Sequence, residues 1–224
     1  MYGIIKNTKG MGFKMNKDNA KKIIEILKKT YPDAKCSLNF NTPFELLIAV
    51  MLSAQCTDER VNKTTPNIFC KYNTPADFAN IDINELEQLV HPCGFYKNKA
   101  KNIKETSKII LEKYDGQVPK TIDDLISLPG VGKKTANVIM LEAFNMPQGV
   151  AVDTHCKRLA NRLGISKNTD PEKIEQDILA LYSQKYYKDI NHIFIYHGRK
   201  ICKSRSADCE NCPIKDYCDY EKNV

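Results

Sequence analysis

Hydrophobic residues recur with helical spacing along almost the whole chain. Apolar side chains repeat every three or four residues, which is the spacing of one face of an α-helix. No stretch shows the sustained apolar and polar alternation, bounded by turn residues, that is typical of strands in a hairpin. The pattern therefore predicts an all-α protein, with about ten helices.

Local signals place the ends of several of these helices. Thr42, Thr74 and Thr121 each precede a proline or an acidic first turn, which is the sequence of a capped helix start. The segment from Thr42 to Ala54 is apolar on every face, so we expect it to form a buried central helix. Further helices are expected at residues 17–30, 58–70, 100–114, 133–145, 154–163, 171–182 and 190–201.

One residue interrupts this regular picture. Pro66 lies inside the expected helix at 58–70. A proline in a helix removes a backbone hydrogen bond and crowds the carbonyl group four residues earlier. We therefore predict a break near Thr65.

Composition excludes an intrinsically disordered protein and a membrane-spanning protein. The chain has 224 residues, of which 42% are hydrophobic and 27% charged, and these proportions are those of a globular protein with one large or two small domains. No apolar run approaches the ~20 residues of a membrane span, and residues 1–14 lack the continuous apolar stretch of a signal peptide. We expect a cytoplasmic protein without a membrane segment. Its net charge of +7 fits a polyanionic partner without requiring one.

The cysteines are unevenly distributed. Four of the nine, Cys202, Cys209, Cys212 and Cys218, lie within 17 residues. In a compartment that keeps thiols reduced, such a cluster indicates a metal centre rather than disulfides. Only one pair has the short spacing usual for zinc, and an iron–sulfur cluster also takes four thiolates, so the spacing alone leaves both open. The other five cysteines are expected to be small buried residues.

A glycine-rich turn joins two of the expected helices. It consists of Leu128, Pro129, Gly130, Val131 and Gly132. Glycine lets the backbone turn tightly and lets a ligand approach it closely. The free N–H groups of the following helix, at the positive end of its dipole, are suited to a phosphate of a nucleic acid. An ordinary turn between helices is an equally good interpretation of the glycines alone.

Lys134 follows this turn, nearly opposite the apolar stripe of its helix. We expect Val138 and Leu141 to cover it partly, as in the wall of a cleft. A lysine is a nucleophile only when its ammonium form is destabilised. The first turn of a helix and the neighbouring charge of Lys133 both have that effect. The alternative is a solvated surface lysine.

Asp153 precedes the helix expected at 154–163 and is placed as its N-cap. A capping carboxylate is held ionised, so it also provides a negative charge of fixed direction. A purely capping role is the alternative.

Over residues 15–221 the chain resembles the endonuclease III group of DNA glycosylases, in the helix-hairpin-helix superfamily. The resemblance is carried, in the order of the family, by residues 43–50, 52–58, 94–100, 128–137, 152–155 and 197–199 and by the spacing of the four clustered cysteines. It implies a two-domain helix-hairpin-helix glycosylase fold. A six-helix barrel domain is expected at 36–147, and an iron-sulfur cluster domain at 15–35 and 148–224. Residues 1–14 are expected to be a variable N-terminal extension.

The resemblance also assigns roles to residues. Lys134 matches the Schiff-base lysine of the family and Asp153 its catalytic aspartate. Gln55 matches the residue that fills the gap left by an extruded nucleotide, and Phe95 the wedge on the opposite strand, where relatives often carry a smaller apolar residue. The four clustered cysteines are expected to hold a 4Fe-4S cluster with a structural role. Further DNA contacts are expected at Leu128, Gly130, Val131, Gly132, Lys133, His155, Lys203 and Arg205.

The implied function is base excision DNA repair. The enzyme would remove oxidised pyrimidines as a DNA N-glycosylase and would cleave 3′ to the abasic site by β-elimination, through a lysine Schiff base. Its partner would be double-stranded DNA with damaged bases or abasic sites, bound by a monomer.

Two alternatives remain. One is an adenine- or mismatch-specific glycosylase of the same superfamily; the adenine-removing relatives lack the lysine nucleophile, so Lys134 argues against them. The other is a non-enzymatic, metal-stabilised DNA-binding module, which would leave Lys134 and Asp153 without a purpose.

Overall fold

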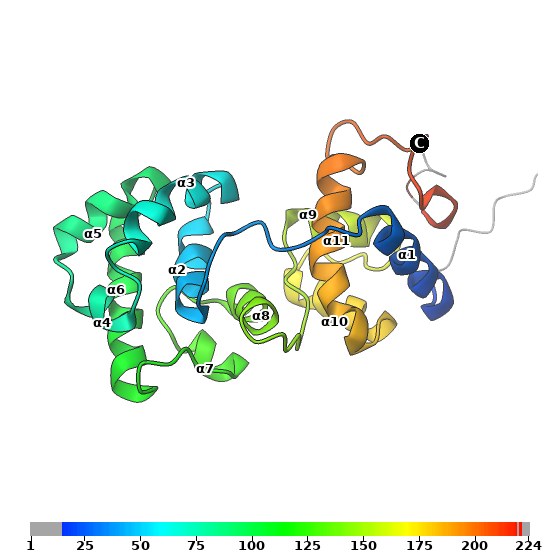
Figure 1. Ribbon diagram of the computed structural model, residues 1–224. Helices are drawn as coiled ribbons and strands as arrows, with labels where there is room; N and C mark the ends of the chain where they lie inside the picture. The colour runs from blue at the N-terminus through cyan, green and yellow to red at the C-terminus, as the bar shows by residue number, and fades with distance from the viewer. Residues whose placement is uncertain (1–14, 219, 221–224) are drawn as a thin grey trace, which may run out of the picture.

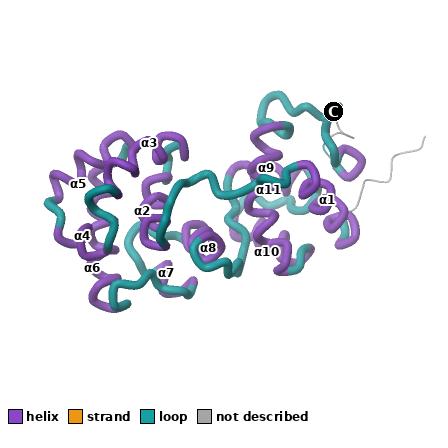
Figure 2. Tube along the Cα trace, in the orientation of Figure 1, coloured by secondary structure: helices purple, strands orange, loops and turns teal. Residues whose placement is uncertain are grey.

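The computed structural model describes residues 15–218 and residue 220, so the expected N-terminal extension lies outside the described residues. Within this part of the chain every regular element is a helix, as Figure 2 shows, and the predicted all-α class is confirmed. None of these helices is both long enough and apolar enough to cross a membrane.

The helices form two groups, each around its own hydrophobic core (Figure 1). The first group contains α2 (Pro43–Ser53), α3 (Asp58–Phe69), α4 (Pro75–Asn80), α5 (Ile83–Val90), α6 (Tyr96–Lys113), α7 (Ile122–Ile126) and α8 (Lys133–Glu142). The second contains α1 (Lys17–Thr30), α9 (Thr154–Arg162), α10 (Pro171–Leu181) and α11 (Tyr187–Lys200). Short 3-10 helices lie at His91–Cys93, Gln184–Tyr186 and Lys215–Tyr217. The chain thus crosses between the groups twice, after α1 and after α8.

Helix α2 lies at the centre of the first group, as predicted. Its residues from Phe44 to Leu52 are all buried. Thr42 is its N-cap, and the Thr42 hydroxyl accepts a hydrogen bond from the Glu45 backbone N–H at 3.1 Å. The buried Glu45 carboxylate accepts from the backbone N–H of Asn41 at 2.6 Å, so the one charged side chain in this buried run has a partner.

The other two predicted threonine caps are also confirmed. Thr74 begins α4 with a complete capping box, in which Asp77 accepts from the backbone N–H of Thr74 at 2.9 Å. Thr121 begins α7 and accepts from the backbone N–H of Asp124 at 3.2 Å. These starts need no tertiary context, because each cap satisfies N–H groups of its own first turn.

The predicted break near Thr65 is wrong, because α3 continues through Pro66 to Phe69. Pro66 lies in the last turn of the helix, so its missing N–H costs a single hydrogen bond there. Thr65 and Ile68, at 1% and 0% exposure, are held in the core on either side of it. Burial of these neighbours offsets the cost that the proline imposes.

The buried carboxylate of Glu175, on α10, connects the two groups. Its Oε1 accepts hydrogen bonds from the side-chain amide of Asn137 at 2.9 Å and from the backbone N–H of Val150 at 3.1 Å. Its Oε2 forms an ion pair with the ammonium group of Lys133 at 3.0 Å. One side chain therefore fixes the start of α8 relative to the segment that leads into α9.

Candidate active site

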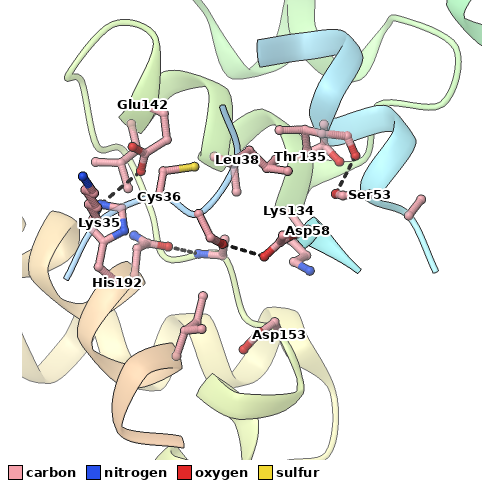
Figure 3. Close-up of a pocket in the computed structure, with 18 of the residues that line it drawn as sticks. Lys35, Cys36, Leu38, Ser53, Asp58, Lys134, Thr135, Glu142, Asp153 and His192 are labelled. Atoms are coloured by element: carbon pink, nitrogen blue, oxygen red, sulfur yellow. Dashed lines mark hydrogen bonds and ion pairs between the residues drawn. The ribbon is translucent and has the colours of Figure 1, made fainter. Parts of the chain in front are cut away.

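A cleft of about 360 Å³ lies between the two groups of helices (Figure 3). Helices α2 and α8 line one side of it, and α11 with the segment before α9 lines the other. Lys134 and Asp153 were each predicted as site residues on separate grounds. Both line this cleft, Lys134 from the first group of helices and Asp153 from the second. The fold thus brings an amine and a carboxylate to the same cavity.

Lys134 is the second residue of α8 and is exposed, and it lines the cleft together with Val138 and Leu141, which were expected to cover it partly. Gly132 precedes the helix, and a side chain there would meet nothing within 4 Å, which leaves the first turn of α8 open. Lys133, whose charge was expected to destabilise the ammonium form of Lys134, has an acidic partner. The ammonium group of Lys133 is paired with Glu175, and that hydrogen bond raises the pKa of Lys133.

Asp153 is the N-cap of α9, as predicted, and its Oδ1 accepts from the backbone N–H of Cys156 at 2.7 Å. The same side chain lines the cleft. Capping and facing the cleft are therefore not alternatives, because the cap is what holds the carboxylate at the cleft wall.

Gln55 and Phe95 have left-handed backbone conformations, with φ of 53° and 49°. Such values are uncommon for residues other than glycine. Gln55 is exposed and lines the cleft, and Phe95 is 62% exposed immediately before α6. What holds these two residues could not be predicted from residue type. The buried ammonium group of Lys99 donates to the carbonyl oxygens of Leu52 at 2.8 Å and Cys93 at 2.9 Å, which ties the two loops together.

The glycine-rich turn joins α7 to α8 and presents mainly backbone. Leu128 and Val131 are buried in the first core, at 2% and 5% exposure, so their side chains are not available to a ligand. Gly130 has φ of +78°, and a Cβ there would lie 2.8 Å from the side-chain nitrogen of Asn102. Gly132 begins α8 without a side-chain cap, so the first N–H groups of the helix remain open to a phosphate.

The four clustered cysteines all line one cavity, together with Arg162 and His197. Arg162 donates to the sulfur of Cys202 at 3.2 Å, and His197 Nε2 lies 3.6 Å from the sulfur of Cys212. Burial raises the pKa of the Cys212 thiol to about 11. Among the described residues, no group of three or more His, Cys, Asp or Glu side chains is arranged to hold a single metal ion.

The remaining predicted contacts lie near this cavity. Lys203 and Arg205 are exposed on the loop that follows Cys202. His155 is half-buried, its Nδ1 lies 3.0 Å from Nη2 of Arg158, and burial lowers its pKa.

Of the five other cysteines, Cys70 is exposed, so the expectation that all five are buried is wrong.

Two polar contacts in the cleft were not predicted from the sequence. Arg199 Nη2 donates to Asp58 Oδ2 at 3.1 Å, and His192 Nε2 lies 3.1 Å from Glu142 Oε1. All four residues line the cleft, and each pair joins the first group to the second. Arg199 follows Asp58 by 141 residues, so no local pattern could have linked them.

Comparisons with known proteins identify the family of the chain. The HhH-GPD family model, described as "HhH-GPD superfamily base excision DNA repair protein", matches residues 48–184. Endonuclease III of Synechocystis is 48% identical over 202 residues, which are 90% of this chain and 92% of that protein.

Solved structures match over the same extent. A non-covalent endonuclease III–DNA complex has a TM-score of 0.88 and 40% identity, and the match covers 93% of this chain and 98% of that one. A trapped covalent endonuclease III–DNA intermediate matches equally well, with the same TM-score and identity. The chain therefore belongs to the endonuclease III family, within the HhH-GPD superfamily of base excision DNA repair proteins.

Proposed function

We propose that the protein is a bifunctional DNA glycosylase that removes oxidised pyrimidines and then cleaves the strand at the resulting abasic site. The observation that carries this proposal is the convergence of Lys134 and Asp153 on one cleft from two different groups of helices. A relative of the same family has been trapped as a covalent DNA intermediate, which supports a nucleophile in such a cleft.

In this proposal the neutral amine of Lys134 attacks C1′ of the sugar. The bond between C1′ and the base breaks, and the base leaves with the electron pair of that bond and takes up a proton. The product carries both the lysine nitrogen, which has lost a proton, and the ring oxygen O4′ on C1′. The bond between C1′ and O4′ then breaks, O4′ takes up a proton, and the lysine nitrogen forms an iminium with C1′. Loss of a C2′ proton from this iminium eliminates the 3′ phosphate, which cuts the strand. The Asp153 carboxylate assists deprotonation of the amine and stabilises positive charge that develops on the sugar.

Access to the sugar requires that the damaged nucleotide leave the duplex. Extrusion costs a few kcal/mol, and less for a poorly stacked damaged base. We assign Gln55 to the gap that the nucleotide leaves and Phe95 to the opposite strand. The left-handed backbone and exposure of both residues support these roles, because strained conformations cluster at functional sites.

Contacts to the DNA backbone are assigned to the glycine-rich turn, to His155 and to the loop after Cys202. Gly132 and the open N–H groups of α8 would meet a phosphate, while Lys203 and Arg205 supply exposed positive charge. Lys133 contributes positive charge at the same helix start, moderated by its ion pair with Glu175. The proposed partner is double-stranded DNA with damaged bases or abasic sites, bound by a monomer.

We further propose that Cys202, Cys209, Cys212 and Cys218 hold a 4Fe-4S cluster. Four cysteines around one cavity fit the donor set of such a cluster. When bound, the cluster would link the ends of this loop and stabilise the fold. Protein purified without oxygen is expected to be brown and to contain about four iron atoms per chain. Stoichiometric zinc in protein expressed with ample iron would contradict this assignment.

We also propose the division into domains that the resemblance implies: a barrel domain at 36–147, where the structure has seven α-helices and six were expected, and a cluster domain at 15–35 and 148–224. Two separate hydrophobic cores support this division. The second core combines α1 with residues that follow the second crossing, as a domain built from both ends of the chain requires.

A duplex with a single abasic site tests the proposed function. The protein is expected to cut the strand 3′ to the site and, in the presence of borohydride, to become covalently joined to the DNA. Borohydride reduces the iminium to a stable amine, so the trapped complex reports the Schiff base directly. A protein that binds this duplex without cutting or trapping would be a DNA-binding module and not an enzyme.

A further inference from the structure

The contact between Glu142 and His192 lies in the cleft but has no part in the proposed sugar chemistry. Glu142 is the last residue of α8, and His192 lies in α11. Their side chains are only 13% and 10% exposed, yet both line the cleft. A nearly buried carboxylate at a ligand cavity is costly unless its oxygen atoms have hydrogen-bond partners.

The position of this pair relative to Lys134 follows from the helix that carries both. Glu142 lies eight residues after Lys134 in α8, which corresponds to about 12 Å along the helix axis. In Figure 3, Glu142, His192 and Cys36 gather at one end of the cleft, away from Lys134 and Asp153. A nucleoside whose sugar meets Lys134 would therefore direct its base toward Glu142.

At this end of the cleft, where Lys35 also lies, the Glu142 carboxylate is a hydrogen-bond acceptor. Glu142 Oε1 is used by His192, and no described residue hydrogen-bonds to Oε2. Cys36 beside it remains a neutral thiol, because burial and then the charge of Glu142 raise its pKa to about 11. A ligand that offers an N–H group would satisfy the remaining carboxylate oxygen.

We propose that Glu142 and His192 form the subsite for the extruded base, and that Glu142 selects pyrimidines that present a ring N–H group. This proposal rests on the proposed function. A ring-saturated uracil or thymine carries such a group at N3, between two carbonyl oxygens. The Glu142 carboxylate accepts from N3–H, while His192 holds the carboxylate in place. An abasic site has no base and does not use the subsite.

A chemical probe tests this with the unaltered protein. Duplexes containing dihydrouracil, N3-methyl-dihydrouracil or an abasic site are compared under single-turnover conditions. The N3-methyl base cannot donate, so its release is expected to be about 10- to 100-fold slower, the range for a lost hydrogen bond to a charged group. Equal release of the two bases would overturn the proposal.

Substitution gives the second test. In Glu142→Ala the rate ratio between dihydrouracil and the abasic site should fall by about 10- to 100-fold, and the discrimination against the N3-methyl base should disappear. Glu112→Ala, at an exposed position on α6, is the matched control and should change neither ratio. If Glu142→Ala slowed both substrates equally, the pair would only join the two groups of helices. If wild-type protein failed to cut the abasic site, the proposed function itself would be wrong.

Discussion

The cleft and the cysteine cavity differ in what holds their side chains in place. Lys134 and Asp153 are fixed by helix ends, one in the first turn of α8 and the other as the cap of α9. Over residues 202–218, by contrast, the one regular element is the three-residue 3-10 helix Lys215–Tyr217. The cleft is therefore organised by packing of the chain itself, whereas the cysteine loop has little backbone regularity of its own.

The cysteine loop is attached to the rest of the protein by side chains. Arg162, at the end of α9, donates to the sulfur of Cys202, to the carbonyl oxygen of Lys203 at 2.8 Å and to that of Ser204 at 3.1 Å. The same loop is held by Ile214, which is buried in the second core, and by Arg158, whose Nε donates to the carbonyl oxygen of Cys202 at 2.9 Å. These contacts come from side chains rather than from regular backbone structure. We infer that ligation of the thiols adds to them, and that loss of a bound ligand would change the cysteine loop more than the cleft.

The largest expected effect is on the chemistry of the cleft. Lys134→Gln should abolish the borohydride-trapped complex, with a loss of about 10³-fold or more, because glutamine cannot form a Schiff base. Binding to lesion DNA, measured by fluorescence anisotropy, should persist. The matched control is Lys113→Gln, at an exposed position in the last turn of α6, and trapping should remain. A trapped complex with the Lys134 variant would place the nucleophile elsewhere.

The second effect concerns the cysteine cavity. Cys212→Ser should lose the bound iron and lower the free energy of unfolding by about 4 kcal/mol, because metal binding to such a loop is coupled to folding. Iron analysis and thermal unfolding measure both. Cys70→Ser, which removes an exposed thiol outside the cavity, is the control and should change neither. Full iron content in the Cys212 variant would remove this residue from the ligand set.

The third effect returns to the cleft and is smaller. Asp153→Asn should fold normally, since asparagine also caps helices. Its turnover should fall by about 10²-fold, as expected when one preorganised charge is removed. Asp170→Asn changes the N-cap of α10 in the same way and should leave turnover intact. A normal rate in the Asp153 variant would leave that side chain with its capping role alone.

Local sequence signals predicted most of the fold and the two principal side chains of the cleft. The caps at Thr42, Thr74 and Asp153 are confirmed because their energetics are contained within one helix turn. The continuation of α3 through Pro66 was not predictable in this way, since it depends on burial against distant helices.

The same distinction applies within the site. Pairing of Glu142 with His192 depends on two helices that meet only in the folded protein. The left-handed backbone at Gln55 and Phe95 has no signal in residue type, because the residues that usually adopt it are glycine and asparagine. Lys99, which ties their two loops together, could be identified only from its backbone contacts.

The smallest expected effect tests whether the glycine-rich turn binds a phosphate or only connects two helices. Gly132 has φ of −91° and ψ of 174°, which valine also adopts, and a side chain there meets nothing within 4 Å. Gly132→Val should therefore keep its melting temperature yet bind damaged and undamaged duplexes alike about 10-fold more weakly, since it would obstruct a phosphate that carries no sequence information.

Gly130→Val provides the contrast. Its φ of +78° and the approach to Asn102 make any side chain strained, at a cost of about 1–3 kcal/mol in the free energy of unfolding. Its weaker binding should thus be accompanied by a lower melting temperature, unlike that of Gly132→Val. Anisotropy titrations with both duplexes at one fixed salt concentration, paired with thermal unfolding, separate the two effects. Normal DNA binding by Gly132→Val would mean that the turn serves only to connect α7 and α8.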